Sequence, residues 1–153
     1  MKKIIYVIAL AFFGITAYAQ PTETELVRSA FRLEKKAIVA DFLQLNEGDA
    51  AKFWPIYEKY EQERVAQVGN RRLQLIDQYV KKYETMDDAS VDKLVTESAA
   101  IQKKEVAVRE KYYNLVKKSI SAGVGARFWQ VEDVISVGVR MQLYNGLPML
   151  QQK

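Results

Sequence analysis

Apolar residues recur at helical spacing along most of the chain and hardly ever alternate with a period of two. Thr22, with Glu25 three residues later, predicts a capping box that opens a first helix. The helix is amphipathic and ends near residues 43–45, with Lys35 away from its apolar stripe. We expect this stripe to face the core; it comprises Val27, Phe31, Ile38, Phe42 and Leu45.

A second helix is predicted from Asn46, an N-cap residue, to about Tyr83. Pro55 lies inside this span and predicts a kink or break, because its ring crowds the preceding turn and it lacks a backbone donor. Gly69 is a further weak point. The inward face of this helix is predicted to contain Phe53, Trp54, Tyr57 and Tyr60, followed by Leu73, Ile76, Tyr79 and Val80.

A long third helix is predicted for residues 89–121, after a polar connection capped by Asp87 or Asp88. Its apolar positions repeat every seven residues, whereas most of the partner positions between them are polar. This predicts a narrow seam, with the middle of the helix packed on a partner subunit or left as an open surface. The apolar positions are Leu94, Ile101, Val108 and Leu115, and the partner positions are Ser98, Glu105, Tyr112 and Ser119.

An internal repeat organises these helices. Residues 45–58 (LNEGDAAKFWPIYE) align without gaps to residues 120–133 (ISAGVGARFWQVED), with identical Gly, Ala, Phe and Trp positions. The repeat predicts an all-α fold of four helices in two helix–turn–helix units, the fourth helix ending at Asn145-Gly146. We assign its motif residues to capping and packing: Leu45, Asn46, Phe53, Trp54, Ile120, Ser121, Phe128 and Trp129.

The N-terminus has the three parts of a secretory signal peptide in order. Lys2 and Lys3 precede an apolar run over residues 4–15, and Ala17-Tyr18-Ala19 supplies a small-x-small cleavage site. Gln20 follows where a lipoprotein would have cysteine. We therefore expect cleavage near Ala19-Gln20, a periplasmic protein without membrane insertion, and one all-helical domain over residues 20–153.

Composition narrows the chemistry. The chain contains neither cysteine nor histidine, which removes disulfides, thiolate nucleophiles, imidazole bases and the commonest zinc ligands. Its formal charge of +4 falls to +2 without Lys2 and Lys3, so nucleic-acid binding has no support. No GxSxG, P-loop or dinucleotide motif occurs. We expect a protein that is not an enzyme and has no metal site and no cofactor.

The layout resembles the LTxxQ family of periplasmic proteins, which is Spy/CpxP-like. Residues 45–64 and 125–135 are similar to its Bacteroidetes branch, whose members are often labelled sensors of ECF-type sigma factors or periplasmic heavy-metal sensors. Asp49 replaces the motif glutamine in the first copy, and the second copy lacks it. The resemblance implies a thin, curved, four-helix homodimer that holds non-native proteins or docks on an envelope-stress sensor. Metal sensing in some relatives uses histidine, which this chain lacks.

Three functions are compatible with this sequence: an ATP-independent envelope chaperone, a regulatory adaptor of a membrane stress sensor or anti-sigma factor, and a structural helical protein without a client. The partners would be non-native or envelope proteins, or the outer domain of a membrane sensor. We expect apolar and aromatic side chains to contact them, with basic neighbours attracting acidic clients. The predicted protein-binding surface comprises Tyr79, Tyr83, Ile101, Lys103, Lys104, Val108, Arg109, Lys111 and Tyr112.

Overall fold

A computed structural model describes residues 23–150, with side chains described from residue 31 on. The chain divides into two units, residues 1–34 and residues 35–153. The described part of the first unit, residues 23–34, is helical throughout. The predicted signal peptide (1–19) and the predicted cap Thr22 lie outside the described residues. The architecture below is that of the second unit.

The described residues form helices joined by short turns, and no strand occurs among them. The predicted second helix consists of α2, a π-helical turn η1, and α3, which follow one another without interruption. The prediction of an all-α fold with four helices and a long third one is therefore confirmed. The elements are α1 (Glu23–Leu43), α2 (Glu47–Arg64), η1 (Val65–Gly69), α3 (Asn70–Lys82), α4 (Asp88–Ser119) and α5 (Ala122–Tyr144).

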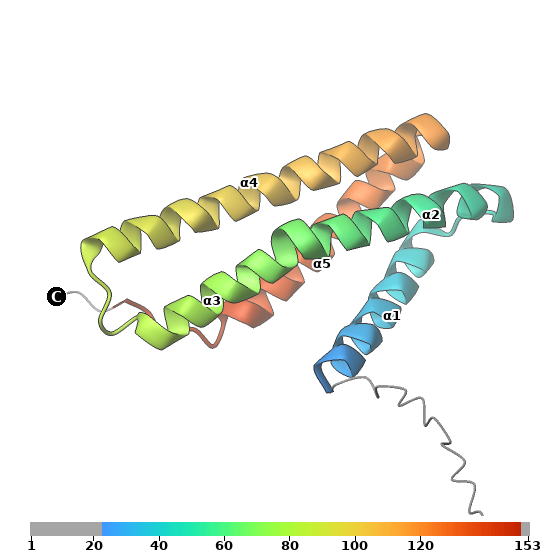
Figure 1. Ribbon diagram of the computed structural model, residues 1–153. Helices are drawn as coiled ribbons and strands as arrows, with labels where there is room; N and C mark the ends of the chain where they lie inside the picture. The colour runs from blue at the N-terminus through green and yellow to red at the C-terminus, as the bar shows by residue number, and fades with distance from the viewer. Residues whose placement is uncertain (1–22, 151–153) are drawn as a thin grey trace, which may run out of the picture. The chain divides into compact units, whose positions relative to one another are not determined.

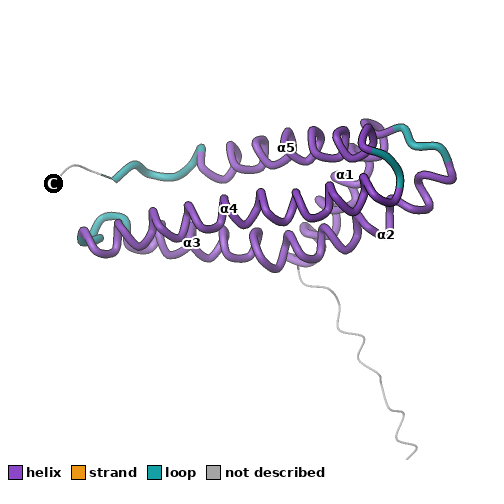
Figure 2. The backbone as a smooth tube through the Cα atoms, turned by 90° about the horizontal axis from the view of Figure 1, so that it is seen from above, coloured by secondary structure: helices purple, strands orange, loops and turns teal. Residues whose placement is uncertain are grey.

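Helix α4 is the central packing element of residues 35–153. It returns along α2 and α3 after the connection at residues 83–87, and α5 then packs along its other side (Figure 1). Viewed from above, α4 has α3 along one part of its length and α5 along its other side (Figure 2). Residues 35–43 of α1 add two fully buried apolar side chains, Val39 and Leu43, to the same core.

The helix starts are capped as the sequence predicts. Asn46 accepts a hydrogen bond from the Asp49 amide at 2.9 Å, and Ser121 accepts one from the Val124 amide at 3.2 Å. Asp87, one of the two predicted candidates, caps α4 through the Ser90 amide at 2.9 Å. Each cap satisfies an amide that the first helical turn leaves without a backbone partner.

Of the kink or break predicted at Pro55, the break does not occur, since α2 continues through it. Pro55 is exposed, so water can reach the backbone carbonyl that loses its usual donor. The irregularity lies instead in η1, which ends at the predicted weak point Gly69. A π-helical turn holds an extra residue, so the inward face after it shifts along the sequence. Arg72 is consequently buried, while Leu73 and Val80 of the predicted inward face are exposed.

The core is aromatic where the two repeats meet. Phe53 and Phe128 are both buried, and their rings lie 6.2 Å apart in an edge-to-face arrangement. Tyr60 contacts Phe128 and Tyr112 in the same manner, at 5.1 and 5.4 Å. Such pairs add about 0.5–1.5 kcal/mol to the burial of each ring, so the repeat motif supplies the centre of the core.

The predicted inward stripe of α1 is wrong in most of its positions. Ile38 is 53% exposed, Phe42 is 45% exposed, and Phe31 is exposed as well. The buried positions are Lys35, Val39 and Leu43, one turn apart, while Leu45 packs against the core as predicted. Lys35 can take an inward position because two carboxylates face it, which the apolar pattern alone does not reveal.

The prediction of a sparsely buried middle of the third helix is also wrong. Ile101, Glu105, Val108 and Tyr112 are all buried in α4, between α2–α3 on one side and α5 on the other. Glu105 is buried despite its charge because the Arg72 guanidinium pairs with it at 2.7 Å. At the end of the helix, Leu115 is exposed and Val116 takes the buried place.

Two glycines of α5 make a matched pair for a packing test. A Cβ at Gly125 would lie 3.0 Å from the Tyr113 ring, whereas a Cβ at Gly138 would meet nothing within 4 Å. We expect Gly125→Ala to lower the free energy of unfolding by about 1 kcal/mol or more through overpacking. Gly138→Ala should raise it by about 0.5–1 kcal/mol, because alanine favours helix. Urea titrations measure both; equal effects would contradict this packing.

Candidate functional site

The repeat brings equivalent residues of its two copies into contact. Phe53 meets Phe128, and the Tyr57 hydroxyl donates to Glu132 at 2.9 Å, both pairs being separated by the repeat offset of 75 residues. Each residue therefore touches its own counterpart, so the starts of α2 and α5 meet through equivalent positions of the repeat. Phe53 and Phe128 both belong to the buried core cluster, which is where a packing role places them.

Each repeat tryptophan has a cation over its ring, supplied by the preceding helix. The Lys36 ammonium lies 4.9 Å from the Trp54 ring centroid and pairs with Glu58 at 3.4 Å. Around Trp129, Arg109 lies 5.2 Å from the ring centroid and pairs with Asp133. Glu58 and Asp133 are equivalent in the repeat, so the two copies share a cation–ring–acid arrangement. Each tryptophan therefore contacts a cation of the helix that precedes its own.

A buried polar network lies beside the aromatic core. Glu132 is fully buried and accepts hydrogen bonds from Lys35 at 2.8 Å, Tyr57 at 2.9 Å and Tyr60 at 2.8 Å. Lys35 also donates to Glu61 at 2.6 Å, and Arg64 binds Glu61 at 2.8 and 3.1 Å. Two cations thus balance two carboxylates, and this pairing offsets the desolvation cost of burying the charges. The network ties α1 and α2 to α5.

A second polar network connects α3, α4 and α5. Glu105 pairs with Arg72 at 2.7 Å and lies 3.6 Å from Arg140, while Arg109 donates to Ser136 at 3.3 Å. Arg109 also pairs with Asp133. These groups hold the helices at the end of the bundle where the apolar pocket described below begins. Arg72 belongs to both, so it fixes one edge of that pocket.

Burial and charge shift several pKa values in these networks. Burial and the neighbouring Glu132 charge raise the pKa values of Tyr57 and Tyr60, so both hydroxyls stay protonated as donors. Burial raises the pKa of Tyr112 to about 12, with a further contribution from its hydrogen bond to Glu63. Burial alone would raise the pKa of Glu61, but the Arg64 hydrogen bond and the Lys35 charge outweigh it and lower it.

These shifts predict a loss of stability in acid. The pKa of Glu105 is also lowered, since its hydrogen bond and ion pair with Arg72 outweigh its burial. A carboxylate with a lowered pKa stabilises the fold fully above its unfolded pKa of about 4.3, and this contribution is lost as the pH falls towards the folded value. We expect the Tm to decrease as the pH is lowered from about 4.5. The decrease should be less steep in the double variant Glu61→Gln/Glu105→Gln. Calorimetry between pH 3 and 7 measures this; identical slopes would contradict it.

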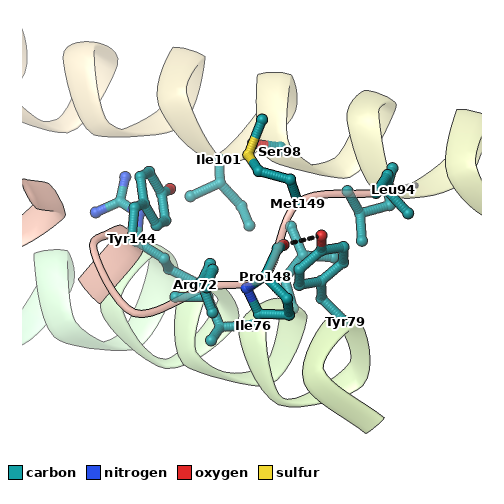
Figure 3. A pocket seen from close by; sticks show the side chains of 12 residues that line it. Arg72, Ile76, Tyr79, Leu94, Ser98, Ile101, Tyr144, Pro148 and Met149 are labelled. Atoms are coloured by element: carbon teal, nitrogen blue, oxygen red, sulfur yellow. Dashed lines mark hydrogen bonds between the residues drawn. The ribbon is translucent and has the colours of Figure 1, made fainter. Parts of the chain in front are cut away.

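An apolar pocket of about 410 Å³ lies between α3 and α4, and we call it the α3–α4 pocket (Figure 3). Such a volume is typical of ligand sites, which combine an apolar lining with a few polar groups. Here the polar groups are Arg72, the hydroxyls of Tyr79 and Tyr144, and Ser98. The lining comprises Arg72, Leu75, Ile76 and Tyr79 of α3, Leu94, Ser98 and Ile101 of α4, Tyr144 of α5, and Leu147, Pro148, Met149 and Leu150.

One wall of the pocket is the segment of residues 147–150, which we call the C-terminal strap. The chain leaves α5 through a turn in which the Leu147 amide donates to the Tyr144 carbonyl at 3.0 Å. The strap then crosses between α3 and α4 without regular secondary structure. The Tyr79 hydroxyl donates a hydrogen bond to the Pro148 carbonyl, drawn as the dashed line in Figure 3.

The predicted protein-binding surface is not one surface. Ile101, Val108, Arg109 and Tyr112 are buried between helices, so they cannot contact a partner on the outside of α4. The seven-residue repeat of Ile101 and Val108 marks the core, because α4 is covered on two sides.

The other five predicted surface residues do not lie together, and the buried Ile101 borders the pocket. Lys103, Lys104 and Lys111 are exposed on α4, and Lys111 pairs with Glu63 at 2.6 Å. Tyr79 and Ile101 line the α3–α4 pocket, whereas Tyr83 is half-buried next to Tyr79, their ring centroids 5.9 Å apart. Only two of the nine predicted residues therefore reach the site that the structure forms.

Sequence reasoning missed most of this pocket. Leu75 lines the pocket while its neighbour Gln74 is exposed, and Leu94 lines it while Val95 is exposed. Only the rotational phase of each helix decides which neighbour faces the pocket. For Leu75, the phase of α3 depends on η1, which no local sequence pattern predicts. The apolar tail Leu147, Pro148, Met149 and Leu150 after the last helix was the available signal, since an apolar tail needs a surface to cover it.

No model of a protein family, no curated protein and no solved structure significantly matches the chain. Among residues 23–150, no helix is both long and apolar enough to cross a membrane. Within the same range, no three acidic side chains are grouped so that they could hold a metal ion.

Proposed function

We propose that this chain is a non-enzymatic, periplasmic protein-binding protein that holds exposed apolar segments of other envelope proteins in the α3–α4 pocket. The observation that carries the proposal is the pocket itself: about 410 Å³, apolar in most of its lining, and open at the end of a bundle whose core lies elsewhere. A pocket of this size takes a few apolar side chains, which suits an unfolded segment better than a folded surface.

Three further features support this function. The N-terminal sequence has the parts of a secretory signal, which favours the periplasm. The paired helix-start motifs resemble the Spy/CpxP-like family, which favours an ATP-independent chaperone of envelope stress. Exposed Lys103 and Lys104 lie on α4, the helix that also lines the pocket, where they would attract acidic clients without a tight site.

A homodimer is part of the proposal. Helix α5 leaves Val134, Val137, Met141 and Tyr144 exposed, at spacings of three, four and three residues. This is the spacing of a coiled-coil seam, and a second copy would cover it. Sedimentation equilibrium of residues 20–153 tests the dimer, and a monomer at micromolar concentration would contradict it.

Aggregation of reduced insulin tests the chaperone function. Its B chain exposes apolar segments after reduction, and the reductant leaves the present protein unchanged because it contains no cysteine. We expect residues 20–153 to suppress the light scattering at a near-stoichiometric ratio without ATP. No suppression at a tenfold excess would contradict a general chaperone. Crosslinking in cells to a single membrane sensor would then favour the regulatory adaptor.

A further inference from the structure

The C-terminal strap has few buried contacts and few hydrogen bonds. None of its four residues belongs to the buried core, Met149 is 85% exposed, and Leu150 is 41% exposed. Beyond the turn at Leu147, the hydrogen bond from Tyr79 to the Pro148 carbonyl is the one polar attachment that the described residues show for it. Segments with few buried contacts open at low free-energy cost.

The strap also has the chemistry of an unfolded protein segment. Its side chains are those of Leu147, Pro148, Met149 and Leu150, and its backbone is irregular. An extended backbone on an apolar surface must find partners for its polar groups. Here Pro148 has no N–H, and the Tyr79 hydroxyl satisfies its carbonyl, so Pro148 lies on the pocket without an unpaired backbone group.

We propose that the C-terminal strap is an internal competitor for the α3–α4 pocket. An extended apolar client segment replaces it, and a client carbonyl takes the hydrogen bond of the Tyr79 hydroxyl. This inference rests on the proposed function and names its ligand class: extended apolar peptide rather than folded protein. The strap would also regulate the apparent affinity for the client, because a client binds only to the fraction of molecules whose strap has left the pocket.

The hydrogen bond from Tyr79 and the paired charge of Arg72 favour a peptide over a lipid chain. Tyr79 lies at one end of the pocket and donates to a main-chain carbonyl, a group that every peptide presents at regular intervals. Arg72, the one cation in the lining, is already paired with Glu105 at 2.7 Å, so it does not present an unbalanced charge to an anionic head group.

The test uses the full mature chain with Leu147→Asp, which weakens the strap without touching the core cluster. The probe is fluorescein-labelled, reduced and carboxymethylated α-lactalbumin, followed by anisotropy. We expect the Kd of the labelled client to fall about fivefold. This is the factor by which the strap lowers the apparent affinity when one hydrogen bond and its apolar contact hold it on the pocket. The matched control is Val106→Asp, a 50% exposed position of α4 outside the pocket and outside the proposed dimer seam, which should leave the Kd unchanged.

A synthetic peptide of residues 145–153 provides the second readout. We expect it to bind the Leu147→Asp variant in trans and to displace the client. An unchanged or higher Kd for Leu147→Asp would overturn the competitor role even though client binding stands. If no variant binds the client, the proposed function fails, while binding of the peptide in trans would still support recognition of the strap. Binding of a fluorescent fatty acid with no peptide binding would overturn the ligand class.

Discussion

Replacement of Glu132 by alanine is expected to lower the free energy of unfolding by about 3–5 kcal/mol. Glu132 is fully buried, and three donors converge on it: the Lys35 ammonium and the hydroxyls of Tyr57 and Tyr60. Its removal leaves these donors unsatisfied and leaves Lys35 with Glu61 alone, a carboxylate already shared with Arg64. A domain of this size should lose roughly 10 °C or more of Tm.

The matched control is Glu58→Ala. Its side chain is 63% exposed and pairs with Lys36 at 3.4 Å, so its removal should cost less than about 1 kcal/mol. The double variant Lys35→Met/Glu132→Leu should recover part of the loss, because it removes both charges instead of stranding one. Thermal melts of the three variants measure this. A loss for Glu132→Ala as small as that for Glu58→Ala would show that the network does not hold α1 and α2 to α5.

Leu94→Asp is expected to reduce client binding about tenfold or more. Leu94 lines the α3–α4 pocket but is not part of the core cluster, so a change there tests the site rather than the fold. A carboxylate in the pocket lacks a cation, because Arg72 is occupied by Glu105, and the apolar burial of the client side chain is lost. Burial of one such side chain contributes about 1.5–3 kcal/mol, which corresponds to a tenfold or larger change in Kd.

Val95→Asp provides the control for this prediction. Val95 is next to Leu94 on α4, but it is 58% exposed and lies outside the pocket. The substitution introduces the same charge as Leu94→Asp. Anisotropy with the labelled α-lactalbumin measures both Kd values, and circular dichroism confirms that both variants are folded. Equal Kd values for the two variants would place client binding elsewhere on the molecule.

The sequence predicts most of the fold because helix caps and aromatic repeats are local. Asn46 and Ser121 cap their helices through their own next turns, and a Phe-Trp pair recurs at a fixed distance from each cap. The inward faces are less predictable, because burial of a charge depends on distant partners. Lys35 can be buried because it pairs with Glu132, 97 residues away. Arg72 can be buried because it pairs with Glu105, 33 residues away.

The candidate site was less predictable than the fold for the same reason. The seven-residue repeat of Ile101 and Val108 gives helix phase, but not which side a neighbouring helix covers. The π-helical turn η1 then changes the phase of α3, so Leu75 faces the pocket and Leu73 faces outwards. A pocket formed by two helices and a tail is a property of their packing, and no single segment encodes it.

Photo-crosslinking from within the pocket tests the central proposal most directly. Ser98 lines the α3–α4 pocket, whereas its neighbour Ala99 is exposed and lies outside it. A benzophenone amino acid placed at each position in turn, with unfolded α-lactalbumin as client, reports where the client lies. The proposal predicts a strong crosslink from position 98 that a peptide of residues 145–153 suppresses, and little from position 99. Equal crosslinking from both positions, insensitive to that peptide, would contradict it.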